Sequence, residues 1–82
     1  MQQERLRDPI DVVVVFSKGK MTPRHFRWAN RTYAVDAVNQ RWTGKNGGIQ
    51  ICYFAVSAVG NAYKLAFNTK ELTWHLEEVY AA

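Results

Sequence analysis

The chain has 82 residues, a formal net charge of +4 and one cysteine. This length allows a single domain with a modest core, so stability depends on good packing or on association. One cysteine excludes an intrachain disulfide and fits a reducing compartment. The apolar runs are too short to span a membrane, and the charged N-terminus is no signal peptide. The sequence therefore predicts a cytoplasmic protein without membrane contact.

Alternation of apolar and polar residues runs through most of the chain and predicts β structure. Residues 1–9 lack this alternation, and we expect them to form a mobile N-terminal arm before a single β domain over residues 10–82. Turn residues divide that domain into six strands that follow one another as a meander: residues 10–17, 23–29, 32–42, 50–58, 62–68 and 73–80.

The second hairpin has a predictable register. A two-residue turn at residues 29–30 or 30–31 suits Asn30, which tolerates positive φ. Either turn places Phe26 and Trp28 on the same face as Tyr33 of the next strand. We therefore expect these aromatic side chains to belong to the core.

Further along the third predicted strand the apolar residues change from odd-numbered to even-numbered positions, which would place them on the opposite face. The apolar residues Val38 and Trp42 return to the core face only if one extra residue, a β-bulge, is inserted near residues 36–37. The loop over residues 43–48 lacks the spacing and the following helix of a phosphate-binding loop.

The C-terminal strands carry their own turn signals. Gly60-Asn61 is the clearest turn and predicts that Val56 lies opposite Leu65. A four-residue turn over residues 69–72 places Phe67 opposite Trp74, and residues 77–78 indicate a second bulge. Six twisted, bulged strands tend to curl, so we expect an all-β fold, a small antiparallel six-stranded meander forming a strongly bent sheet or a small barrel.

Three side chains are candidates for catalysis: Cys52, His25 and His75. The predicted faces separate them, because Cys52 alternates with core residues while both histidines point outward. A buried structural thiol explains Cys52, and the spacing offers no metal site. We therefore predict no catalytic residue, no metal and no cofactor, and we do not expect an enzyme.

Basic side chains supply the remaining candidate site. They lie on the predicted solvent face of the second hairpin and in later strands and loops: Arg24, Arg27, Arg31, Arg41, Lys45 and Lys64. A basic stripe on a small β domain can follow a phosphate backbone. A solvated charged surface without a partner is equally compatible with this pattern.

The order of apolar residues resembles that of a known family. The spacing P-x-x-F-x-W-x(4)-Y-x-V-x-x-V-x(3)-W runs from Pro23 to Trp42, and matching aromatic positions follow as far as Tyr80. It resembles a family of small uncharacterised bacterial domains, found alone or as a C-terminal tail of Y-family-polymerase-like proteins of SOS mutagenesis. The resemblance begins near Asp11 and carries no catalytic residue. Family members often have glycine and more arginine at residues 29–31.

Two functions remain open. The first is a non-catalytic binding module that contacts nucleic acid through its basic face; the resemblance implies a DNA repair or translesion context. The alternative is a protein–protein interaction or self-association module with no nucleic-acid contact. That alternative would use a free strand edge or the small-residue face made by Tyr53, Ala55, Ser57 and Ala66.

Overall fold

A computed structural model describes residues 2–81, which form one antiparallel sheet. The order across the sheet is β3-β2-β1-β7-β6-β5-β4. The predicted all-β antiparallel class is confirmed, but there are seven strands in place of six: β1 (Gln2–Ser17), β2 (Lys20–Trp28), β3 (Arg31–Ala34), β4 (Ala37–Asn46), β5 (Ile49–Ala58), β6 (Asn61–Asn68) and β7 (Thr73–Ala81).

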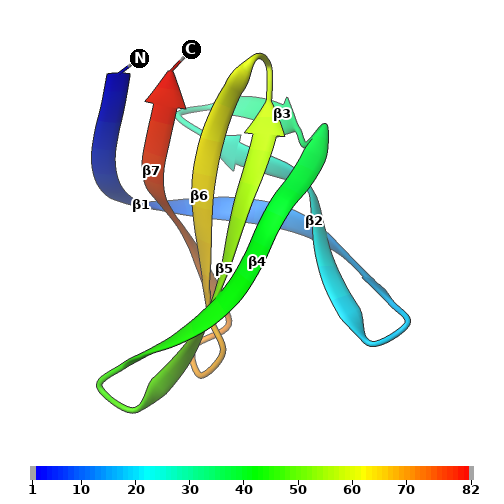
Figure 1. Ribbon diagram of the computed structural model, residues 1–82, viewed down its shortest axis with the longest axis vertical. Coiled ribbons are helices and arrows are strands. Elements are labelled where there is room, and N and C mark those ends of the chain that lie inside the picture. Colours follow the sequence, from blue (N-terminus) through cyan, green and yellow to red (C-terminus); the bar gives the residue numbers. More distant parts are fainter. Residues whose placement is uncertain (1, 82) are drawn as a thin grey trace.

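Strand β1 belongs to both halves of the sheet. Its first part pairs with β7, from Gln2 opposite Ala81 to Ile10 opposite Trp74. Its second part, from Asp11 onward, pairs with β2. Figure 1 shows β1 crossing behind the other strands, with both chain ends at the same side of the molecule. Most of the segment expected to be an arm therefore lies in a strand, where Leu6 packs against the core.

A second corner lies between β3 and β4. The strand expected over residues 32–42 is divided there by Val35 and Asp36. The Val35 amide donates to the Arg24 carbonyl (2.9 Å), whereas the Asp36 amide donates to the Ser57 carbonyl (2.8 Å). Two consecutive residues thus bond to opposite ends of the sheet.

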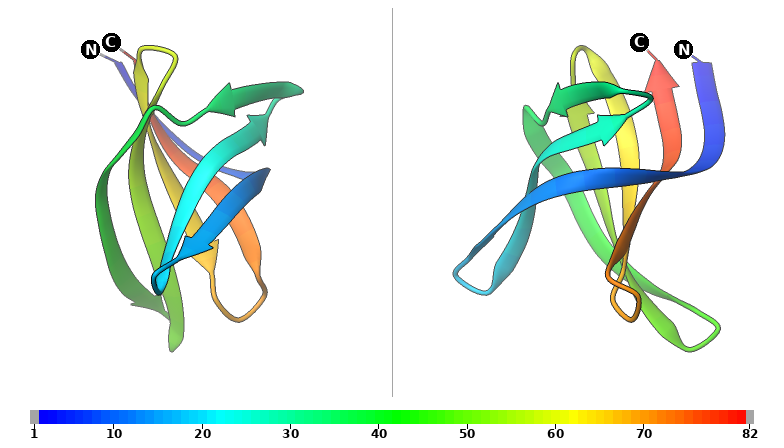
Figure 2. Two further views of the ribbon diagram at one scale, coloured as in Figure 1. Left: turned by 90° about the vertical axis from the view of Figure 1, so that its right-hand side faces the viewer. Right: turned by 180° about the vertical axis from the view of Figure 1, so that it is seen from behind.

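This corner bends the sheet but does not close it. The link of two residues holds the edge strands β3 and β4 close together, yet they are not neighbours in the sheet. Figure 2 shows the β2–β3 hairpin turned steeply across the face of the longer strands. The barrel alternative is therefore wrong, since closure requires the two edges to pair.

Several predicted registers are confirmed. Positive φ at Ala29 and Asn30 makes a two-residue turn, which places Phe26 opposite Tyr33. The four-residue turn before β7 places Phe67 opposite Trp74. The predicted second bulge is present as well, because the β6–β7 register shifts beside Glu77.

Two register predictions are wrong. The β5–β6 turn is Val59-Gly60, both with positive φ, so Val56 lies opposite Tyr63 and not Leu65. The slip of two residues leaves every side chain on its expected face. In β4 a bulge at Asn39 turns Trp42 to the face opposite the core, where its ring stacks on Tyr53.

The core lies inside the bend and joins the two halves. Phe26 stacks on Tyr33, with ring centroids 4.9 Å apart, and meets the Tyr63 ring edge-on at 5.1 Å. The expectation that the hairpin aromatics are core residues is confirmed for Phe26 and Tyr33. The buried apolar side chains around them are Ile10, Phe54, Val56, Ala58, Leu65, Trp74 and Leu76.

Candidate nucleic-acid interface

The β2–β3 hairpin presents four exposed basic or imidazole side chains, which we call the basic face: Arg24, His25, Arg27 and Arg31. His25 and Arg27 alternate with the buried Phe26, so they point away from the core. The β1–β2 register shifts beside Arg24, which leaves this residue bulged. Inward packing of the hairpin thus directs the charges outward.

Arg31 lies at the rim of this face. It begins β3 directly after the turn, and its guanidinium carbon is 5.7 Å from the centroid of the Tyr33 ring. The arginine therefore covers an exposed edge of the core while its charge stays in solvent.

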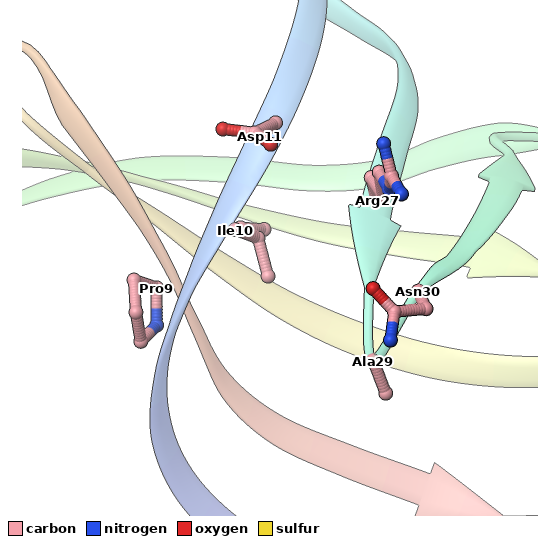
Figure 3. A pocket seen from close by; sticks show the side chains of 6 residues that line it. All are labelled: Pro9, Ile10, Asp11, Arg27, Ala29 and Asn30. Carbon is pink, nitrogen blue, oxygen red and sulfur yellow. The ribbon is translucent and has the colours of Figure 1, made fainter.

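Strand β1 extends the same surface with apolar side chains. Val13 lies opposite His25 and is 61% exposed, and Val15 is 39% exposed. Asp11 lies opposite Arg27 in the ladder. Figure 3 shows these two on adjacent strands, with the carboxylate directed away from the guanidinium. Arg27 therefore keeps its charge available to a ligand.

A shallow pocket lies at the end of this hairpin. It has a volume of about 310 Å³ and is lined by Pro9, Ile10, Asp11, Arg27, Ala29 and Asn30. Figure 3 shows Ile10 between the two strands, with Asn30 at the turn. The pocket offers one guanidinium, one carboxylate and one amide beside the apolar side chains of Pro9, Ile10 and Ala29.

Positive charge is concentrated in this half of the sheet. Residues 10–36 contain five basic side chains, Lys18, Lys20, Arg24, Arg27 and Arg31, against two acidic ones, Asp11 and Asp36, a net charge of +3 out of +4 for the chain. The rest of the chain is nearly neutral. Lys18 and Lys20 are exposed at the β1–β2 turn and add to this charge, although neither is among the six predicted binding residues.

Arg41 is not part of the basic face. The bulge at Asn39 places it opposite Phe54, on the core side of β4. Its guanidinium donates to the Met21 carbonyl at 2.6 Å and to the Thr22 hydroxyl oxygen at 3.3 Å. Although Arg41 is among the predicted binding residues, it does not point outward with the hairpin arginines, because the bulge reverses its direction.

Lys64 is also engaged within the protein. Its ammonium lies 3.5 Å from the Glu77 carboxylate and 3.2 Å from that of Glu78, and 4.8 Å from the centroid of the Tyr53 ring. Partial burial lowers the pKa of Lys64, but the two carboxylates outweigh this effect and hold that pKa above its ordinary value. Tyr80 donates to Glu78, which raises the tyrosine pKa.

This cluster also changes the small-residue face. Lys64 and Trp42 cover Tyr53, and Ala66 is buried. Lys45 lies apart from both clusters, exposed near the β4–β5 turn at the far end of the molecule from β3 (Figures 1 and 2). Of the six predicted binding residues, the structure thus brings Arg24, Arg27 and Arg31 together on one hairpin.

The candidate catalytic side chains remain separated. Cys52 is half-buried on the core side of β5, opposite Phe67. His25 lies on the outer side of β2, and His75 alternates with the buried Trp74 and Leu76. Residues 2–81 contain no group of three or more histidine, cysteine or acidic side chains that could hold a metal ion.

Comparison with known proteins finds no matching family model, no matching curated protein and no matching solved structure. The family resemblance therefore stays a prediction. Within the part of the chain that the structure describes, no helix has the length and apolarity needed to cross a membrane.

Proposed function

We propose that this domain is a non-catalytic nucleic-acid-binding module that uses its basic face. The observation that carries the proposal is the placement of charge: one hairpin collects three exposed arginines, and its half of the sheet holds most of the net charge. Phosphate contacts of this kind supply affinity without sequence information. Binding is therefore weak, salt-dependent and largely independent of base sequence.

Single strands fit this surface better than duplex. The exposed valines of β1 lie beside the arginines, so unpaired bases can rest on apolar surface while the backbone follows the charges. The resemblance to domains fused to Y-family-polymerase-like proteins favours single-stranded DNA as the first ligand and DNA repair as the context.

Fluorescence anisotropy with labelled oligothymidylate tests this proposal. Three or four phosphate contacts give a slope of roughly −2 to −3 for log affinity against log salt on single strands. The triple variant Arg24→Glu, Arg27→Glu, Arg31→Glu reverses the local charge without altering the buried residues of the hairpin. It should lose binding and keep its circular dichroism spectrum.

A second triple variant controls for net charge. Arg7→Glu, Lys45→Glu and Lys70→Glu change the total charge by the same amount at exposed positions outside the hairpin. This variant should keep more of the wild-type affinity than the first. Equal loss in both variants would show that only total charge matters, and no binding by wild type at about 20 mM salt, where screening is weak, would exclude nucleic acid.

A further inference from the structure

The sheet has an open seam between β2 and β4. Residues 20–23 of β2 pair with β1 on one side, and β4 pairs with β5 on one side. Among residues 2–81, neither segment has a second strand beside it. Two strand edges with unpaired backbone groups therefore border the same gap, a geometry that invites an additional strand.

A side chain bridges the seam where backbone pairing ends. Near the corner the Val35 and Asp36 amides still bond to the sheet. Further along, Arg41 reaches from β4 to the Met21 carbonyl and the Thr22 hydroxyl. Its guanidinium carbon also lies 5.7 Å from the centroid of the Phe54 ring. A long, flexible cation thus holds a position that a ladder of backbone bonds would occupy in a closed sheet.

Beside Arg41 the seam widens into a groove of about 340 Å³. Its lining combines two cations with apolar and small polar side chains and has no acidic member: Lys20, Met21, Arg41, Trp42, Thr43, Cys52, Tyr53 and Phe54. The charge of the lining is therefore complementary to a carboxylate placed among apolar groups.

The aromatic residues that line this groove are poorly suited to stacking on bases. The rings of Trp42 and Tyr53 lie on the opposite face of the sheet, where they stack on each other at 5.4 Å beneath the Lys64 ammonium. Phe54 is buried beneath Arg41. Base stacking needs a free ring face, so the groove favours a peptide over nucleic acid.

We propose that the seam between β2 and β4 binds an extended peptide segment with an acidic side chain. The peptide lies along the free edge of β4 and bonds to its backbone, as in other cases of strand addition. Its carboxylate accepts hydrogen bonds from Arg41, whose planar guanidinium suits that partner, and lies near Lys20. Alternate side chains enter the apolar groove. This site is independent of the basic face.

Selection from a displayed library of random peptides tests the proposal. Peptides of about nine residues match the length of β4 at a rise of about 3.3 Å per residue. Selected sequences should share an acidic residue at a fixed position. Titrating one of them into isotope-labelled protein should move backbone resonances of residues 20–23 and 38–45 and leave residues 27–32 unchanged.

Two variants assign the acidic contact. Arg41→Gln and, separately, Lys20→Glu should each weaken the selected peptide, the first by roughly tenfold, the loss of one charge-assisted pair. Lys20 is exposed near the hairpin tip, so its variant stays informative where Arg41→Gln unfolds. Unchanged affinity in folded variants, or selected peptides without a shared acid, would overturn the proposal.

Oligothymidylate of about ten nucleotides is the competing probe. It should move resonances on the basic face and leave the peptide bound in the seam. Displacement of the peptide by the oligonucleotide, with shifts confined to residues 20–23 and 38–45, would assign the seam to nucleic acid and refute the peptide proposal. The triple arginine variant should bind the peptide as the wild type does, so the two proposals fail separately.

Discussion

Trp28 shows how one side chain combines packing with a polar tie. Its indole Nε1 donates to the Asp8 carboxylate at 2.9 Å, and its ring lies 6.1 Å from that of Tyr33. Trp28 is only half-buried, unlike Trp74. The sequence predicts both tryptophans as core residues, yet it offers no sign of the bond to Asp8, which lies in the segment expected to be an arm.

Replacing Trp28 should separate these two contributions. Trp28→Ala should lower the free energy of unfolding by about 3 kcal/mol, the lower end for such a truncation, because the ring is partly exposed. Trp28→Phe keeps much of the packing and should cost about 1 kcal/mol for the lost hydrogen bond. Urea denaturation measures both. An unchanged midpoint for Trp28→Ala would show that the ring does not support the core.

At the scale of the element, the turns are the most informative feature. The β5–β6 turn places Val59 at a φ of 51°, a conformation that β-branched residues rarely adopt. Local residue preferences favour a turn at Gly60-Asn61, which explains why the predicted β5–β6 register is wrong by two residues. The observed register places Phe54 opposite Leu65 and Val56 opposite Tyr63, and it holds Val59 in this strained conformation.

Val59→Asn should therefore stabilise the protein. The side chain is 65% exposed, so little packing is lost, and Asn-Gly is the preferred pair for this turn. Relief of the left-handed strain should raise the free energy of unfolding by about 1 kcal/mol, measured by thermal denaturation. Val13→Asn is the matched control: an equally exposed valine in an ordinary strand, which should give no gain. A lower melting temperature for Val59→Asn would contradict this account.

The other elements show what local patterns can and cannot predict. Alternation and turn residues were enough for the β2–β3 and β6–β7 registers and for the bulge at Glu77. Local patterns were insufficient to predict the bulge at Asn39, because that bulge depends on how β4 pairs with its neighbouring strand β5. That bulge turns Arg41 to the core side of β4, where it reaches the Met21 carbonyl across the seam, so the sequence could not predict this contact.

At the scale of the whole molecule, β1 holds the two halves of the sheet together. It contributes to the ladder on both sides of its bend and brings Leu6 and Ile10 to the core. The charged residues between them conceal this role from an alternation pattern, which is why the sequence indicates an arm. The basic face depends on this strand, since β2 and β3 reach the rest of the sheet through it.

Removing residues 1–9 should therefore damage the whole domain. The shortened chain loses the Leu6 contact, the Asp8 acceptor and most of the pairing with β7. Loss of the leucine alone should cost at least about 2 kcal/mol, and the exposed β7 edge should promote association. Urea denaturation and analytical ultracentrifugation measure the two effects. A shortened monomer as stable as the full chain would support the mobile arm.

The pairing of Gln2 with Ala81 has a consequence for how the chain acquires its shape. Hairpins between neighbouring strands form quickly because their closure entropy is small, whereas β1 and β7 are almost a full chain length apart. Such non-local pairing slows folding toward the millisecond-to-second range. During synthesis the N-terminal part of β1 stays unpaired until its partner β7 has left the ribosome. Until then the nascent domain leaves unpaired the edges of β1 and β6 that β7 covers in the finished sheet, and it is most vulnerable to aggregation just before β7 pairs.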